Sequence, residues 1–311
     1  MLIVFGAIAM ELRVPVDQFP TQTLQATASD YVMNAGGKAT AQAFAATRSG
    51  AKVAIIGKTG IDDYAKRIVD KLRREGVVTT GVGKSESTHT GLKIIATDKT
   101  GQVQIINSPG ANTQASAEQC PEEILKEQSI LLLQTDLNGK ENLELLKKAK
   151  ANGAKTILNL APTITITQDV LDNLDYLILN NREAKNFAAK MGIPSDANAK
   201  KIAEALSKIG NLTCIITLGE DGAIAYSPED KIWHTPGIEL KNLVDRHAAE
   251  DVFCGTFAAC VQASMHISSA LRRANIAAGI SCEKAGGLAS FPYLSEIDER
   301  LAELGDIEAD N

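Results

Sequence analysis

Short apolar runs alternate with helix-patterned stretches through most of this 311-residue chain. The apolar runs, each long enough for one buried strand, are 2–5, 53–57, 129–134, 156–159, 176–179 and 213–217. The helix-patterned stretches between them are 37–49, 64–75, 140–152, 182–191 and 197–209. Strands without a polar face, separated by helices, are typical of a mainly parallel sheet with helices on both faces. The sequence therefore predicts a three-layer α/β/α fold.

Two segments interrupt this alternation of strand and helix patterns and predict a second, smaller sheet. Residues 90–106 alternate in polarity around a turn at 98–101, which is typical of an exposed hairpin. Residues 12–33 are polar and strand-prone and have no helix caps. Together these regions, about 10–35 and 88–108, are expected to form a small β lid over a pocket.

Composition and charge narrow the range of partners. The net charge of −6 argues against general binding to nucleic acid or to acidic membranes. The five cysteines have no CxxC spacing, which favours buried free thiols in a reducing compartment. No apolar run approaches the roughly 20 residues that span a bilayer, and Glu11 and Arg13 follow the apolar start at once. We therefore expect one cytoplasmic domain over residues 1–311, with neither nucleic acid nor membrane as a partner.

Residues 245–251 (DRHAAED) form a loop that leads into a helix of small residues expected over 252–265. The start of such a helix presents free backbone N–H groups and the positive end of the helix dipole, which together make an anion site. Asp251 can act there as a general base toward a substrate hydroxyl. Glu250 conflicts with this interpretation, because it places a carboxylate where a phosphate would bind.

Three further motifs each allow a structural and a functional interpretation. Residues 36–38 (GGK) either permit an unusual turn or let a ligand approach the backbone closely. Asn180 and Glu183 follow a predicted strand and form either a capping box or a site for a hydrated magnesium ion beside a nucleotide phosphate. Residues 217–222 (TLGEDG) also end a strand, and their glycines either make a turn or pass close to a nucleotide.

Seven short motifs in a fixed order resemble the ribokinase branch of the PfkB carbohydrate-kinase family. In this sequence they are 36–38 (GGK), 57–62 (GKTGID), 159–162 (NLAP), 180–183 (NNRE), 217–219 (TLG), 245–251 (DRHAAED) and 286–292 (GGLASFP). One such motif alone is weak evidence, but seven in order, spread essentially from end to end, are specific. The resemblance implies a ribokinase-like fold with a β lid and the ATP-dependent phosphorylation of a hydroxyl group on a small sugar or nucleoside-like substrate.

The resemblance also implies roles for individual residues. Asp251 matches the base that deprotonates the sugar hydroxyl, and Ala248 and Ala249 match the anion hole. Positions that hold ATP and its magnesium ion are matched by Asn180, Glu183, Thr217, Gly219, Gly222 and Asn275. Positions that contact the sugar are matched by Glu11, Gly36, Gly37, Lys38, Ala41 and Asp136. Many ribokinases bind potassium or another monovalent cation in the region matched by Asp245, His247, Gly286 and Ser290. A homodimer formed through the lid is a further implication.

Several positions depart from the ribokinase pattern. Ala41 stands where the family has a sugar-binding asparagine, and Ala9 and Glu11 replace an asparagine and an aspartate near the start. A pocket built to hydrogen-bond hydroxyl groups discriminates strongly through those bonds. We therefore expect weak recognition of ordinary ribose.

Glu250, which replaces the family's glycine, leaves two hypotheses about function. Its charge within ~5 Å of a transferred phosphate would oppose binding by several kcal/mol, unless Arg246 neutralises it or the side chain turns outward. A left-handed backbone at position 250 would add strain. The first hypothesis is a working small-molecule kinase with an altered acceptor. The second is a ligand-binding or regulatory protein that keeps the fold and has lost efficient transfer.

Overall fold

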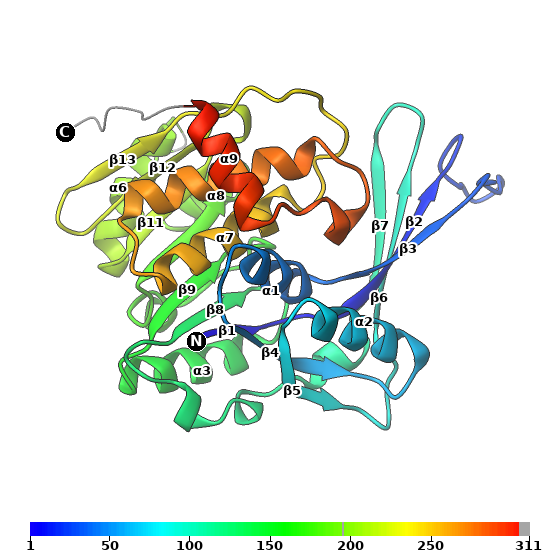
Figure 1. Cartoon of the computed structure of the whole chain (residues 1–311), viewed down its shortest axis with the longest axis horizontal. Coiled ribbons are helices and arrows are strands. Elements are labelled where there is room, and N and C mark those ends of the chain that lie inside the picture. Colours follow the sequence, from blue (N-terminus) through cyan, green and yellow to red (C-terminus); the bar gives the residue numbers. More distant parts are fainter. Residues whose placement is uncertain (195, 305–311) are drawn as a thin grey trace.

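A nine-stranded sheet forms the centre of the computed structural model, which describes residues 1–194 and 196–304 (Figure 1). The strand order across this sheet is β13 (Ile232–Thr235), β12 (Ala223–Tyr226), β11 (Thr213–Thr217), β10 (Tyr176–Asn180), β9 (Lys155–Asn159), β8 (Ile130–Gln134), β1 (Leu2–Phe5), β4 (Val53–Thr59) and β5 (Val78–Lys84). Neighbouring strands from β11 to β5 are parallel, and β12 and β13 extend one edge in antiparallel fashion. The predicted, mainly parallel sheet is confirmed.

Helices cover both faces of this sheet (Figure 1). They are α1 (Lys38–Arg48), α2 (Asp63–Arg74), α3 (Gly139–Ala151), α4 (Gln168–Leu171), α5 (Asn181–Lys190), α6 (Ala199–Gly210), α7 (Ala249–Gln262), α8 (Ile267–Cys282) and α9 (Leu294–Leu304). Leu2 and Val4 of β1 pack into one core with α1, α7 and α8. Ile3 and Phe5 point to the other face and pack into a second core with α3, α5 and α6. The fold is therefore the expected three-layer arrangement.

A separate four-stranded sheet projects beside the main body (Figure 1). Its strands, in spatial order, are β3 (Val32–Gly36), β2 (Ala9–Pro15), β6 (Gly91–Thr97) and β7 (Val103–Ser108). The central strands β2 and β6 are parallel, and the outer strands pair with them in antiparallel fashion. The predicted hairpin and small sheet are thus confirmed, and every residue of β7 is exposed. We call this sheet the lid sheet.

Helix α7 approaches α1 closely because small residues form the contact. A Cβ atom at Gly255 would collide with the Gln42 carbonyl oxygen of α1 and would lie 2.8 Å from Ala45 Cβ. Helix α7 also starts earlier than predicted, at Ala249, so Asp251 belongs to its first turn. The close packing brings that turn up to the side chain of Gln42. Within the described ranges, no helix is both long and apolar enough to cross a bilayer.

Candidate active site at the start of helix α7

Two pockets meet at the first turn of α7. The strand-end pocket, with a volume of about 450 Å³, lies beyond the ends of β10 and β11. The lid pocket, of about 290 Å³, lies between the lid sheet and the starts of α1 and α7. Arg246, Ala249 and Glu250 line both pockets. One short stretch of chain therefore forms the wall between them.

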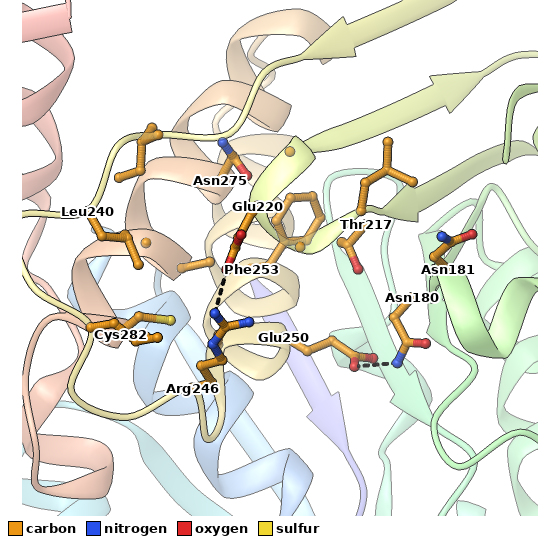
Figure 2. A pocket seen from close by; sticks show the side chains of 18 of the residues that line it. Asn180, Asn181, Thr217, Glu220, Leu240, Arg246, Glu250, Phe253, Asn275 and Cys282 are labelled. Atoms are coloured by element: carbon orange, nitrogen blue, oxygen red, sulfur yellow. Dashed lines mark hydrogen bonds and ion pairs between the residues drawn. The ribbon is translucent and has the colours of Figure 1, made fainter.

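The strand-end pocket gathers polar side chains from several elements (Figure 2). Asn180 is the last residue of β10, and Thr217 is the last residue of β11. Asn275 of α8 lines another part of the pocket and donates from Nδ2 to the Pro236 carbonyl oxygen at 2.8 Å. This is the edge at which open α/β sheets bind ligands, because the carboxyl ends of parallel strands meet there.

The backbone of this pocket depends on two glycines. Gly219 and Gly222 have φ angles of 67° and 90°, in the left-handed region that other residues rarely adopt. A Cβ atom at Gly222 would also collide with the Thr235 carbonyl oxygen. Apolar side chains complete the lining, chiefly Leu218, Ile238, Leu240, Leu243 and Phe253. The pocket thus combines an apolar surface with a few polar groups, as small-molecule sites commonly do.

The lid pocket is lined by the predicted glycine motif. A Cβ atom at Gly36 would collide with the side chain of Glu11. Gly37 has a φ angle of 88°, and a Cβ atom there would collide with the Ala7 carbonyl oxygen. Both glycines are therefore required by local packing and backbone conformation, and both also line the pocket. Ala41 contributes only a methyl group to the same lining.

Asp251 lines the lid pocket from the first turn of α7. Its Oδ1 accepts hydrogen bonds from Lys38 Nζ at 3.3 Å and from Gln42 Nε2 at 2.9 Å. Burial lowers the pKa of Lys38, but nearby carboxylates, Asp251 first among them, outweigh burial and raise it well above its usual value. Lys38 is therefore a fixed positive charge beside the candidate base.

Glu250 points inward, between the two pockets (Figure 2). Asn159 Nδ2 donates to Glu250 Oε1 at 2.8 Å, and Asn180 Nδ2 donates to Oε2 at 3.0 Å. Arg246 pairs instead with Glu220. Two of the possibilities raised by the sequence are therefore wrong, because Arg246 does not pair with Glu250 and the Glu250 side chain does not turn outward.

Backbone strain also lies elsewhere than expected. Glu250 has helical conformation, whereas Ala248 adopts the left-handed region with a φ angle of 63°. A residue with a Cβ atom pays a steric cost there of roughly 1–2 kcal/mol. The conformation turns the chain so that Ala249 begins the helix, and the first turn of α7 contributes to the wall shared by the two pockets.

A line of buried amide side chains connects Asp251 to Glu250. Gln42 Nε2 donates both to Asp251 and to Asn159 Oδ1, the latter at 3.1 Å, and Asn159 in turn donates to Glu250. Gln134 Nε2 donates to Gln42 Oε1 at 2.6 Å and orients that amide. Gln42, Gln134 and Asn159 are all 0% exposed, so these bonds are screened little by solvent. The sequence offered only a weak signal for them, as amides in otherwise apolar surroundings.

Asn180 and Glu183 form the predicted capping box of α5. Glu183 N donates to Asn180 Oδ1 at 2.9 Å, and Asn180 N donates to Glu183 Oε2 at 3.0 Å. Burial raises the pKa of Glu183, and the charge of Glu250 raises it further, to about 7. The structural interpretation is therefore correct, and the same two residues lie next to a second carboxylate.

Asp136, predicted to contact the sugar, does not line either of these two pockets. Burial raises its pKa to about 6, against the opposing effect of Lys38. Its Oδ1 is enclosed and has no hydrogen-bond partner among the described residues. Asp136 is therefore close enough to interact electrostatically with Lys38, but it is not part of the lining of the lid pocket.

The predicted monovalent-cation residues are only partly assembled around a pocket. Asp245 Oδ2 accepts from Arg13 Nη1 at 2.8 Å, and its Oδ1 accepts from the His247 backbone N–H at 2.8 Å. His247 lines the lid pocket, whereas Gly286 and Ser290 line neither pocket. Both Asp245 oxygens are thus already engaged, one of them by a guanidinium group.

The fold and the two joined pockets define a small-molecule kinase of the ribokinase-like type. The model of the pfkB family of carbohydrate kinases matches residues 1–293, and the chain belongs to that family. A ribokinase of Lactococcus lactis subsp. lactis is 30% identical over 304 residues, which cover 97% of each chain.

Two solved structures extend the similarity to the whole fold. Ribokinase from Thermotoga maritima has a TM-score of 0.88 and 29% identity, with coverage of 96% of this chain and 98% of that one. Ribokinase from Arabidopsis thaliana, solved in complex with ribose and ATP, has a TM-score of 0.86 and 25% identity, with coverage of 96% and 97%. The chain is therefore a sugar kinase by family.

Proposed function

We propose that this chain catalyses the ATP-dependent phosphorylation of a hydroxyl group on a small sugar or sugar-like substrate other than ordinary ribose. The meeting of two pockets at the first turn of α7 carries this proposal. The strand-end pocket suits the nucleotide, since it combines apolar lining with the polar ends of β10 and β11. The lid pocket suits the acceptor, because Asp251 lines it. The similar ribokinase of Arabidopsis thaliana was solved with both ribose and ATP, which supports binding of an acceptor and a nucleotide by one such chain.

In this proposal Asp251 accepts the proton of the acceptor hydroxyl as that oxygen attacks the γ-phosphate. The hydrogen bonds from Lys38 and Gln42 both end on Oδ1, and they leave Oδ2 for the hydroxyl. The amides at the start of α7 and the positive end of its dipole stabilise charge that develops on the transferred group. Lys38 adds a positive charge to the same place.

The oxygen donors beside Asn180 fit a hydrated magnesium ion. Burial and the charge of Glu250 raise the pKa of Glu183, which means that the two carboxylates crowd each other. A divalent cation would relieve that repulsion, and oxygen ligands together with water are what magnesium prefers. When bound, the ion neutralises phosphate charge during transfer. No group of three or more His, Cys, Asp or Glu side chains able to hold a metal is found in the described part of the chain.

The lining of the lid pocket supports an acceptor other than ribose. Ala41 offers a methyl group where the ribokinase pattern has an asparagine. Glu11 is only 8% exposed and already lies near Arg13, Lys93 and His247. A hydroxyl group that relied on the missing amide would lose a partner on binding.

A second candidate is a protein that binds such ligands and transfers phosphate poorly. The inward position of Glu250 favours this candidate. Asn159 and Asn180 donate hydrogen bonds to the Glu250 carboxylate, and these N–H groups could otherwise bind a phosphate. The retained position of Asp251 in the lid pocket favours the kinase.

The proposal is tested by screening sugars and nucleosides for ATP turnover with magnesium, in the native chain and in Asp251→Asn. We expect at least one acceptor to be phosphorylated and expect Asp251→Asn to reduce kcat by roughly 10²–10⁴-fold. The size of Asn should preserve binding, which nucleotide-induced thermal stabilisation would report. Absence of turnover with every acceptor, together with absence of nucleotide binding, would refute the kinase.

Three further properties belong to the proposal. We propose a homodimer through the lid sheet, because β7 leaves Val103, Ile105 and Ile106 exposed at a sheet edge.

We propose a cytoplasmic location, supported by cysteines that are all buried and free. Potassium binding remains a prediction, and the engagement of Asp245 by Arg13 argues that turnover will depend little on potassium.

A further inference from the structure

Several charged residues gather at the lid side of the lid pocket. Glu11 and Arg13 are two residues apart on β2, so their side chains share one face of the lid sheet. Lys93 of β6 is the register partner of Glu11, which places it on the same face. His247 reaches this group from the loop before α7. All four line the lid pocket.

The three basic side chains approach one carboxylate without forming close hydrogen bonds to it. His247 Nε2 lies 3.4 Å from Glu11 Oε2, Lys93 Nζ lies 3.7 Å from Oε1, and Arg13 Nη2 lies 3.9 Å from Oε2. Charge-assisted hydrogen bonds between such groups are usually about 2.7–2.9 Å long. The N–H donors of Arg13, Lys93 and His247 therefore have no close hydrogen-bond acceptor on Glu11.

The missing hydrogen bonds can be assigned to particular atoms of Arg13. Its Nη1 donates to Asp245, but its Nε and Nη2 are enclosed and have no hydrogen-bond partner among the described residues. Nε and Nη2 form one edge of the guanidinium group, and two parallel N–H donors of this kind match a carboxylate or a phosphate. Leaving them unpaired is costly in a buried place.

The pKa of Glu11 shows that the electrostatic potential around its carboxyl group is positive. Burial raises the pKa of its carboxyl group, yet contact with His247 and the charges of Lys93 and Arg13 lower it to about 2. The basic groups thus stabilise negative charge here by more than burial disfavours it. One carboxylate is present already, and unfilled donors remain beside it.

We propose that the acceptor substrate carries an anionic group, a carboxylate or a phosphate, which binds to Arg13 and Lys93 with support from His247. This inference rests on the proposed function, since it names the class of substrate for the same pocket. The anion binds at the lid side, and the hydroxyl to be phosphorylated lies at the Asp251 side. Nε and Nη2 are enclosed in the structure, so binding of the anion requires the guanidinium edge to turn toward the pocket, and a neutral sugar gives that edge no charged partner.

The test compares matched ligands by isothermal titration, with a non-hydrolysable ATP analogue and magnesium present. Two sets are used: ribose, ribonate and ribose 5-phosphate, and glucose, gluconate and glucose 6-phosphate. We expect at least one anion to bind about tenfold or more tightly than its neutral sugar, and to weaken with added salt. The acid and phosphate arms identify which anion is recognised. Equal binding of neutral and anionic members in both sets would overturn the proposal.

Variants then assign the preference to residues. Lys93→Met keeps the aliphatic stem and should weaken binding of the anion by about tenfold more than binding of the neutral sugar. Lys93→Arg should retain the preference for the anion. Arg13→Met combined with Lys93→Met should abolish it. Lys99→Met is the matched control, because Lys99 lies at the turn of the same hairpin, pairs with Asp17 and is absent from the pocket lining. Thermal unfolding checks that each variant folds. A preference that survives in the double variant would also overturn the assignment.

Turnover of the same ligands separates this inference from the proposed function. Tight binding of an anion, together with absence of turnover for every acceptor and absence of nucleotide binding, would refute the kinase and leave the anion site standing. Phosphorylation of a neutral acceptor without any preference for anions would support the kinase and refute the anion site.

Discussion

In the proposed function, Glu250 is the residue that most affects phosphate binding at the first turn of α7. Its two oxygens accept from Asn159 and Asn180, so it occupies amide donors between the two pockets. As a helical residue it gains about 0.3–1 kcal/mol from the dipole at a helix start. Repulsion of a phosphate within ~5 Å amounts to several kcal/mol at intermediate dielectric. Because the repulsion of the phosphate exceeds the gain from the helix dipole, we expect Glu250 to slow phosphate transfer more than it stabilises the helix.

Replacing Glu250 with glycine should therefore increase ATP turnover, or tighten nucleotide binding, by about 10–100-fold. Glu250→Gln is the matched control: it keeps the size and removes the charge, so most of the gain should appear there too. Steady-state kinetics and nucleotide titration measure both. A loss of magnesium-dependent binding in either variant would mean that Glu250 helps to hold the metal instead.

Glu11 links the lid to the pH dependence of stability. Its folded-state pKa of about 2 lies below the ordinary value of 4.5, so its contribution is present above pH 4.5 and is lost as pH falls toward 2. At 1.36 kcal/mol per pKa unit, the contribution is roughly 3 kcal/mol at most. Glu11→Gln should thus be destabilised at pH 7, and its difference from the native chain should shrink between pH 4.5 and pH 2. Urea unfolding across that range measures it, and a constant difference would contradict it.

At the scale of elements, the contact of α1 with α7 assembles the site. Gln42 comes from α1 and Asp251 from α7, and the two meet because Gly255 lets the helix backbones approach. The Ala-rich and Gly-containing patterns of these helices predicted their existence. They did not predict that the helices would touch, since the contact joins segments far apart in sequence.

Adding one methyl group at this contact should loosen the site. Gly255→Ala places a Cβ atom against the Gln42 carbonyl oxygen, so we expect destabilisation of about 1–3 kcal/mol and a fall in kcat. The control is Gly139→Ala at the start of α3, where a Cβ atom meets nothing within 4 Å. That change should be neutral or stabilising by up to about 1 kcal/mol. Thermal unfolding of both proteins provides the comparison, and equal effects would argue against close packing at Gly255.

At the scale of the whole molecule, the lid sheet leaves large apolar side chains exposed along its outer strand. Ile105 is 55% exposed and Ile106 is 68% exposed, on an edge strand that has no neighbour on its outer side in the described chain. Ile106→Lys should shift a dimer to a monomer in analytical ultracentrifugation. Ile209→Lys on α6, away from the lid, should not. A native chain that is monomeric at all concentrations would remove the proposed dimer.

The overall architecture was predictable because most of its strands are apolar on both faces, and such strands have few alternatives to a covered parallel sheet. Strand β5 escaped prediction, since Val78–Lys84 contains two glycines and two threonines and forms an edge of the sheet. The direction of Glu250 and the partner of Arg246 could not be predicted either. Both depend on side chains from β9, β10 and the loop after β11, which only the folded chain brings together.

The shared wall of Arg246, Ala249 and Glu250 has a consequence for how this enzyme changes over evolutionary time. A substitution of one of these three residues alters the lining of both pockets at once. If the pockets hold acceptor and nucleotide as proposed, acceptor choice and phosphate handling cannot change independently there. Laboratory evolution toward a new acceptor should therefore repeatedly select changes at Arg246, Ala249 or Glu250, even when selection is applied to the sugar alone.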